Sequence, residues 1–335
     1  MAKEFSSIDA IRNEMESVGE RMDIGMLCVK SANRAIADAA LRPDPRALYL
    51  ELWYEGETSC LFADSNLGKS IFAVQIAAEI ALTEKVLLVD CELSDKQFQL
   101  RYTNPLTGQR HLFPDNLLRA EIIPDAIEVK DFEEYLLHTI EQVSEQYGAM
   151  VIIIDNLTYL CNSSDKGVDA GLFMMKLMAL KKKHQWSLLI IAHTPKRSLS
   201  SPITQNDLAG SKKLFNFFDS VFAIGRSAVD DELRYIKQLK VRAGAFKYDS
   251  SNVIVCEIVK EDDGNLLFHQ IGFAKEREHL SEKTEKDTDV RDQNILELVE
   301  QNKTYKEISN ILGVSTGLIS KVVSRSRQSK NPVNG

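Results

Sequence analysis

The sequence has few cysteines, and they form no recognisable pattern. Its 335 residues include 5 cysteines, an odd number, scattered along the chain without C-x-x-C spacing. Such a set favours reduced side chains in a protein core over a disulfide framework or a zinc site. We therefore expect a cytoplasmic protein.

The sequence also lacks a long apolar run. A helix that spans a membrane needs about 18 or more consecutive apolar residues, and no segment approaches that length. The first residues, Met1 to Phe5, lack the apolar core of a signal peptide. We expect no membrane partner and no secretion.

An excess of basic residues is absent as well. Lys and Arg number 41 against 49 Asp and Glu, which gives a net charge of -8. This excludes a protein coated in basic surface, so any contact with nucleic acid must come from local patches. The length and a hydrophobic content of 44% suit one large domain with one or two small ones.

A phosphate-binding pattern stands at residues 61–70, which end in Gly-Lys-Ser. It lies between an apolar run, Thr58 to Phe62, and an apolar helical pattern, Ile71 to Leu82. A strand that turns directly into a helix aims backbone N–H groups and the positive end of the helix dipole at one point, which suits an anion. The motif G-x-x-x-x-G-K-[ST] matches except at its first glycine, where Ala63 would cost roughly 1 kcal/mol in a left-handed conformation.

We expect this loop to bind ATP with Mg²⁺. Lys69 would reach the β- and γ-phosphates, and the Ser70 hydroxyl would take one position on Mg²⁺. A helix start that binds no ligand is the alternative. The residues expected to contact the nucleotide are Ala63, Asp64, Ser65, Asn66, Leu67, Gly68, Lys69 and Ser70.

Strand and helix patterns alternate from Leu48 to Ala274, which indicates an α/β fold with a mostly parallel sheet covered by helices. Apolar runs without alternation suit strands buried on both faces. These runs are Thr58–Phe62, Val86–Asp90, Met150–Asp155, Ser187–Ala192 and Ser220–Ile224. Three later runs are linked by short turns and predict antiparallel hairpins at a sheet edge. They are Arg234–Val241, Val253–Val259 and Leu266–Ile271.

Further residues at strand ends predict the rest of the site. Asp155 closes an apolar strand, the Walker B arrangement in which the carboxylate orients Mg²⁺ and its waters; such an Asp otherwise caps a helix. Glu92, just past the second strand, is the candidate residue to position or deprotonate water. Asp90 is the other candidate for this role. Alternatively, Glu92 is only an acid in the first turn of the next helix. His193 closes the fourth strand, where it would sense the γ-phosphate or serve as a structural hydrogen-bonder.

Three segments flank the expected ATPase domain, residues 47–275. Residues 1–46 have helical spacing and predict an arm that packs on the main domain, joins a neighbouring subunit or acts as a cap. Residues 276–288 are acid-rich and predict a linker. Residues 289–328 predict three short helices, with a capping box at Thr304 and Glu307 and a turn at Gly313, the arrangement of a helix-turn-helix.

The order of the motif residues in the expected ATPase domain resembles that of the RecA-type ATPase core. More narrowly, it resembles the hexameric replicative and plasmid-type helicases related to DnaB and RepA. The similarity covers about residues 48 to 274 and rests on Gly68-Lys69-Ser70, Glu92, Asp155, His193, Leu208-Ala209-Gly210-Ser211 and Lys240-Val241-Arg242. The resemblance implies that Glu92 activates water in ATP hydrolysis. It also implies a homo-oligomer, expected to be a hexamer, in which Lys240 and Arg242 enter the neighbouring subunit's site. A solvated hairpin edge is the alternative for this pair.

We expect DNA as a partner at two places. Loops at a ring centre would track the phosphates of single-stranded DNA through Lys196, Arg197, Lys212 and Lys213, and residues 162–167 would join them. In the last helix, residues near its start would face a major groove while later ones meet phosphates. These residues are Thr316, Ser320 and Lys321, then Arg325. A protein-docking module is the alternative.

Three functions are compatible with these features. The favoured one is an oligomeric, helicase-like ATPase that acts on DNA in replication or transfer of a plasmid or mobile element, a context implied by the resemblance. The others are an ATP-controlled DNA-binding regulator and a filament-forming recombination ATPase. Strand displacement on a forked duplex separates the first from the other two.

Overall fold

The computed structural model describes residues 22–123, 131–156, 169–194, 200–208, 212–242, 244–280 and 285–330. The chain forms two compact units, residues 1–46 and 47–335. Among the described residues, no helix is long and apolar enough to cross a membrane.

The described part of the first unit is a β-hairpin followed by a helix. Strands β1 (Met22–Ile24) and β2 (Leu27–Val29) pair antiparallel, and α2 (Ala32–Ala40) follows them. Helical spacing was predicted throughout residues 1–46. The helix α2 agrees with it, but residues 22–29 do not, because Gly25, at φ 58°, turns the chain into the hairpin. The rest of that pattern lies outside the described residues.

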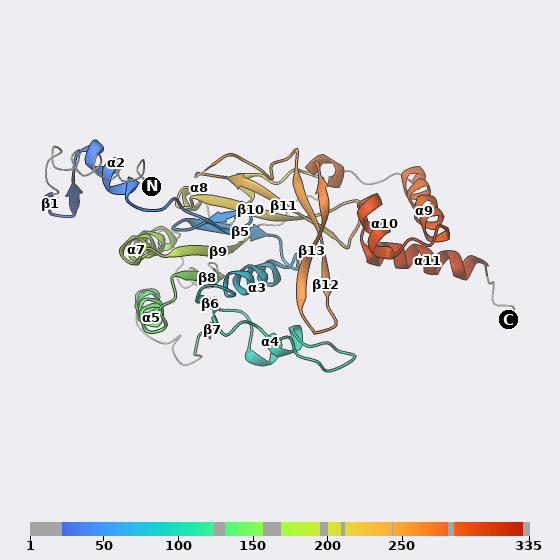
Figure 1. Cartoon of the computed structure of the whole chain (residues 1–335), viewed down its shortest axis with the longest axis horizontal. Coiled ribbons are helices and arrows are strands. Elements are labelled where there is room, and N and C mark those ends of the chain that lie inside the picture. Colours follow the sequence, from blue (N-terminus) through green and yellow to red (C-terminus); the bar gives the residue numbers. More distant parts are fainter. Residues whose placement is uncertain are drawn as a thin grey trace, which may run out of the picture. The chain divides into compact units, whose positions relative to one another are not determined.

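The second unit is built on a nine-stranded sheet (Figure 1). A two-stranded ribbon, β3 (Ala47–Tyr49) and β4 (Trp53–Tyr54), precedes it in the chain. The sheet order is β13-β12-β11-β10-β5-β9-β8-β6-β7. Its strands are β5 (Thr58–Ala63), β6 (Val86–Asp90), β7 (Leu117–Glu121), β8 (Val151–Asp155), β9 (Ser187–His193), β10 (Ser220–Arg226), β11 (Leu233–Lys240), β12 (Val253–Lys260) and β13 (Leu266–Ala274).

Every neighbouring pair from β10 to β7 in this order is parallel, whereas β10 to β13 pair antiparallel. The predicted α/β fold with a mostly parallel sheet and late hairpins is therefore confirmed. Strand β7 was not predicted. Its sequence, Leu-Leu-Arg-Ala-Glu, is only half-buried at the sheet edge and lacks the apolar run of the central strands.

Apolar helices cover both faces of the sheet. On one face, α3 (Lys69–Ile80) contributes residues such as Phe72 and Ile76 to a core with alternate strand residues. On the other face, α5 (Phe132–Tyr147), α7 (Asp169–His184) and α8 (Lys212–Phe215) pack on the remaining strand residues. Strand β8 divides its side chains in this way, since Ile152 and Ile154 belong to one core and Ile153 to the other.

The C-terminal residues form three helices around a separate apolar core. They are α9 (Glu285–Glu300), α10 (Tyr305–Leu312) and α11 (Thr316–Lys330). The capping box of Thr304 and Glu307 is present, Gly313 ends α10 at φ 61°, and the Ser315 hydroxyl accepts the N–H of Leu318. The core of this helical module consists of Ile295, Ile308, Val314, Ile319, Val322 and Val323.

The predicted linker begins with residues that pack on the sheet. A short 3-10 helix covers Glu276–His279, and both named residues are buried. Glu276 accepts a 2.6 Å hydrogen bond from the ammonium of Lys237 on β11 and a 2.8 Å bond from the N–H of Ile203. Composition predicted a solvated segment, but these long-range partners hold Glu276 inside the unit, so its assignment to a linker is corrected.

Candidate functional site

The phosphate-binding loop joins β5 to α3 with two residues in left-handed conformations. Strand β5 ends at Ala63, which is 1% exposed, and the positive φ angles fall on Asn66, at 62°, and Gly68, at 90°. Ala63 is part of the extended strand, so the strain expected at the missing first glycine does not arise. Asn and Gly are the residue types that tolerate the left-handed region best.

Gly68 is required by its surroundings as well as by its φ angle. A Cβ atom placed on Gly68 would lie 2.8 Å from Cδ1 of Ile258 and 3.0 Å from the ring of Phe268. These side chains come from β12 and β13, so the late hairpin presses directly on the loop. The antiparallel part of the sheet therefore helps to shape the nucleotide loop.

Lys69 lies folded over the loop. Its ammonium donates 3.0 Å hydrogen bonds to the carbonyl oxygens of Ala63 and Asp64. Burial lowers its pKa, and the carboxylates of Asp155 and Glu92 oppose that effect. The ammonium is thus held against the backbone carbonyl oxygens at the end of β5.

Register brings the remaining strand ends level with the loop. Ala63 pairs with His193 across β5 and β9, and Asp90 pairs with Asp155 across β6 and β8. The carboxyl ends of parallel strands meet at one edge of such a sheet, and that edge is the usual ligand crevice. The structure therefore places the strand-end residues singled out in the sequence at the same edge.

Asp155 is buried beside Ser70. Burial raises the pKa of this carboxyl to about 7, and the hydrogen bond from the Ser70 side chain opposes the shift. A buried carboxylate next to a hydroxyl supplies hard oxygen ligands of the kind that Mg²⁺ prefers. The two residues predicted to hold the metal are adjacent, and their donor types fit the ion.

Glu92 and His193 meet through a residue that sequence reasoning missed. The Nδ2 group of Asn156 donates to Oε1 of Glu92 and lies 2.9 Å from Nε2 of His193. Asn156 directly follows the Asp that closes β8, and that position was the available signal. Because Asn156 contacts both side chains, it fixes the orientation of the predicted water-activating carboxylate relative to the histidine.

Asp90, the other candidate to activate water, accepts structural hydrogen bonds at both carboxylate oxygens. Its Oδ1 accepts the N–H groups of Glu92 and Leu93 at 3.1 and 3.0 Å, and its Oδ2 accepts Nε of Arg119 at 3.0 Å. Arg119 comes from the unpredicted strand β7 and also bonds Asp95. Asp90 therefore shapes the turn that presents Glu92, whose own side chain is 39% exposed.

A cavity of about 470 Å³ opens over the loop. Its lining joins α3, the strand ends and the late hairpin, and comprises Ser65, Asn66, Gly68, Lys69, Ser70, Ile71, Glu92, Arg101, His193 and Ile258. The size suits a small-molecule cofactor. Arg101, the last residue of α4 (Asp95–Arg101), was not predicted, and its Nη1 is buried without a hydrogen-bond partner among the described residues.

Lys240 and Arg242 lie at the opposite end of the strands from the phosphate loop, near the start of β5. Arg242 pairs at 2.5 Å with Asp219, whose second oxygen accepts the N–H of Thr58 at the start of β5. The ammonium of Lys240 donates to the carbonyl of Phe215. Since the phosphate loop follows the far end of β5, neither cation reaches the loop of its own chain.

The predicted DNA-contacting residues divide into three groups. Lys196 and Arg197, with residues 162–167, lie outside the described residues, as do the side chains of Lys212 and Lys213. Ser320 is exposed, and the Arg325 side chain is 78% exposed. Thr316 and Lys321 are instead engaged with acids of the ATPase sheet. The expectation that the start of α11 stands free to enter a groove is therefore corrected.

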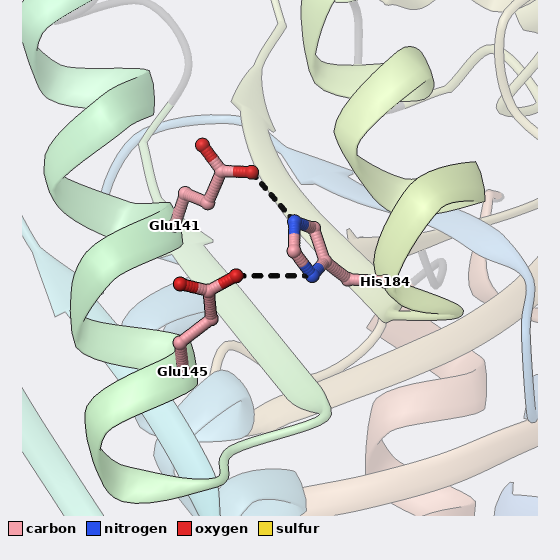
Figure 2. A group of neighbouring side chains, drawn as sticks. All are labelled: Glu141, Glu145 and His184. Carbon is pink, nitrogen blue, oxygen red and sulfur yellow. Dashed lines mark hydrogen bonds and ion pairs between the residues drawn. The ribbon is translucent and has the colours of Figure 1, made fainter.

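A second cluster of possible metal ligands lies between α5 and α7. Figure 2 shows His184 with one ring nitrogen facing Glu141 and the other facing Glu145, at 2.6 and 3.7 Å. Lys183 also pairs with Glu141 at 2.7 Å. Lys183 and His184 together lower the pKa of Glu141 to about 2. These contacts of Lys183 and His184 with the two glutamates tie the two helices together.

Comparison with known families decides the classification. A model described as an AAA domain matches residues 28–198, which include the loop, Glu92, Asp155 and His193. The chain belongs to this AAA domain family. The comparison with curated proteins finds no match.

Among solved structures, a KaiC-like protein from the hyperthermophilic archaeon Pyrococcus horikoshii OT3 is similar at 14% sequence identity and a TM-score of 0.48. The similarity covers 65% of this chain and 91% of the other. The AAA domain match covers the phosphate-binding loop and the parallel strands β5, β6, β8 and β9, so this α/β fold is that of a P-loop ATPase domain.

Proposed function

We propose that this chain is an ATP-hydrolysing, oligomeric ATPase that acts on DNA. The observation that carries the proposal is that Lys69, Ser70 and Glu92 line one cavity, with Asp155 buried beside Ser70. Lys69 would bind the β- and γ-phosphates, while Ser70 and Asp155 would hold Mg²⁺, which neutralises phosphate charge when it is bound. Glu92, oriented by Asn156, would take a proton from the attacking water.

The position of the basic pair supports assembly as a condition for hydrolysis. Lys240 and Arg242 cannot serve the loop of their own chain, because Arg242 pairs with Asp219 at the opposite end of the strands. Cations delivered from a neighbouring subunit stabilise charge on a transferring phosphoryl group. We therefore assign these two residues to the neighbour's site in a homo-oligomer, with a hexamer as the expected assembly and helicase-like action on DNA as the expected output.

The docking of α11 on the ATPase sheet favours a second function in which the output is regulated DNA binding without strand displacement. Unwinding of a forked duplex with ATP separates the two. Displacement supports the helicase-like function, whereas ATP-dependent duplex binding without displacement supports the regulator.

The test of the nucleotide site uses two substitutions. Lys69→Ala should abolish ATP turnover and weaken nucleotide binding, whereas Glu92→Gln should bind nucleotide and lose turnover. Normal hydrolysis by Glu92→Gln protein would remove Glu92 from the mechanism.

The test of the interface mixes two inactive proteins. Lys69→Ala protein combined with Arg242→Ala protein should recover part of the ATPase activity, because a mixed interface pairs an intact loop with an intact Arg242. Absence of recovery at every mixing ratio, in proteins shown to co-assemble, would contradict the assignment in trans.

A further inference from the structure

The start of α11 is bound by carboxylates from the β10–β11 turn and from β12 of the ATPase domain. The N–H and hydroxyl of Ser315 donate to Oδ2 of Asp230 at 3.3 and 3.0 Å. The N–H and hydroxyl of Thr316 donate to Oε2 of Glu257 at 2.9 and 3.2 Å. One turn later, the ammonium of Lys321 donates to Glu232 at 2.6 Å. Three acids therefore occupy the end of the helix that sequence reasoning assigned to a DNA groove.

These contacts have the chemistry of phosphate recognition. In DNA complexes, phosphate oxygens accept hydrogen bonds from helix N-terminal N–H groups, from Ser and Thr hydroxyls and from Lys. Here Asp230, Glu232 and Glu257 accept from the same set of donors. With the module docked, Asp230 and Glu257 are 6% and 5% exposed, so two of the three carboxylates are enclosed at this contact, which we call the acidic seat.

The hydrogen bonds and ion pair at the start of α11 join two parts of the chain whose apolar cores are separate. The apolar residues of the helical module, Ile319 and Val322 among them, form their own cluster and do not merge with either core of the sheet. Ion pairs and hydrogen bonds at a domain contact weaken with salt and yield to a competing anion more readily than a shared apolar core does. The contact is thus of a kind that can open while both parts stay folded.

The two ends of α11 differ in accessibility. Ser315 is buried and Thr316 is partly buried against the acids, whereas Ser320, Lys321 and Arg325 are exposed. In the docked arrangement the first residues of α11, which lie nearest the base edges in helix-turn-helix proteins, are therefore covered, and Lys321 is paired with Glu232.

We propose that Asp230, Glu232 and Glu257 form an intramolecular competitor of DNA, an acidic seat that must release the start of α11 before the helical module binds a duplex. The inference rests on the proposed function, because it requires that the module bind DNA. Its occupant is the module itself, and the competing ligand is the phosphate backbone of double-stranded DNA.

The test reverses one charge of the seat in the full-length protein. Glu232→Lys places a second ammonium group beside that of Lys321 and should open the contact. Because the side chain of Glu232 is about half exposed, the substitution should not affect folding. Glu278→Lys makes the same charge change at an exposed acid two residues beyond Glu276 and serves as the control. Glu257→Gln is a milder second variant that keeps an acceptor for Thr316 while removing the charge.

Two readouts are measured for each protein. Amide hydrogen exchange over residues 315–321, without DNA, reports docking. Binding to a mixed-sequence duplex at fixed salt reports competition. Glu232→Lys should speed exchange and bind the duplex about tenfold more tightly than the Glu278→Lys control, equivalent to losing one good competing contact. Glu232→Lys combined with Lys321→Glu should restore slow exchange.

Unchanged exchange in Glu232→Lys, or a gain in duplex affinity no larger than that of the Glu278→Lys control, would overturn the competition. Deletion of residues 287–335 tests the underlying DNA role separately. If the deletion lowers duplex affinity and Glu232→Lys has no effect, the inference fails while the proposed function stands. If the deletion changes nothing, the DNA role of the module fails as well.

Discussion

The Nε2 atom of His193 lies 3.4 Å from Oε1 of Glu92, although the two residues end or follow strands that are not neighbours in the sheet. Strand β8 lies between β9 and β6, and Asn156, which follows β8, bonds both side chains. The proposed water-activating carboxylate is therefore oriented by residues from three strand ends.

Removing Asn156 should impair turnover more than binding. In Asn156→Ala, Glu92 loses the donor that fixes it, and a misplaced catalytic group lowers kcat by on the order of 10- to 100-fold. The measurement compares kcat for ATP with the Kd of a non-hydrolysable analogue. Asn252→Ala, which removes an amide that bonds the carbonyl of Lys247, is the matched control. A wild-type kcat in Asn156→Ala would show that Asn156 does not position Glu92.

Arg101 should contribute to nucleotide binding. Its Nη1 is buried in the wall of the cavity without a hydrogen-bond partner among the described residues, and such a group gains a partner when an anion binds. We expect Arg101→Ala to weaken ATP binding about tenfold or more and Arg101→Lys to recover part of the loss. Titration of a fluorescent nucleotide measures both. Equal affinity in Arg101→Ala and the wild type would place Arg101 outside the binding site.

Asp155 should make the nucleotide-free protein less stable as pH rises. Its pKa is raised from 3.8 to about 7, chiefly by burial. Between these values the native state binds a proton that the unfolded state has released, so the free energy of unfolding falls as pH increases through this window. Asp155→Asn removes the ionisation. Without Mg²⁺ or nucleotide, the Tm of Asp155→Asn minus that of the wild type should be larger at pH 8 than at pH 5. A difference that does not grow with pH would contradict the shift.

The buried ion pair of Lys237 and Glu276 should be essential for stability. Glu276 is 2% exposed, and Glu276→Ala would leave the Lys237 ammonium uncompensated. Breaking such a pair typically costs about 3–5 kcal/mol. Urea unfolding measures the loss, and Glu278→Ala, at an exposed position two residues on, should change the free energy of unfolding by less than about 0.5 kcal/mol. Equal stability of the two variants would return Glu276 to the role of a linker residue.

Features that depend on neighbours along the chain could be predicted from the sequence. The apolar runs of β5, β6, β8 and β9 identified buried parallel strands, because a strand covered on both faces needs no polar alternation. The loop at 68–70 and the capping box at Thr304 likewise depend on residues a few positions apart. Since parallel strands share one direction, the strand ends that carry Glu92 and Asp155 were also predictable as one site.

Which distant residues contact those features became known only from the folded chain. Arg119 holds Asp90 from a half-buried edge strand, Asn156 bridges Glu92 to His193, and Glu276 is buried by Lys237. Composition made the segment of Glu276 resemble a linker. Likewise, the sequence predicted that the start of α11 faces a DNA groove. The hydrogen bond from Thr316 to Glu257 that covers it depends on a strand 59 residues away. Pairings at such separations follow from the packing of the whole chain, which no local pattern of charge or hydrophobicity encodes.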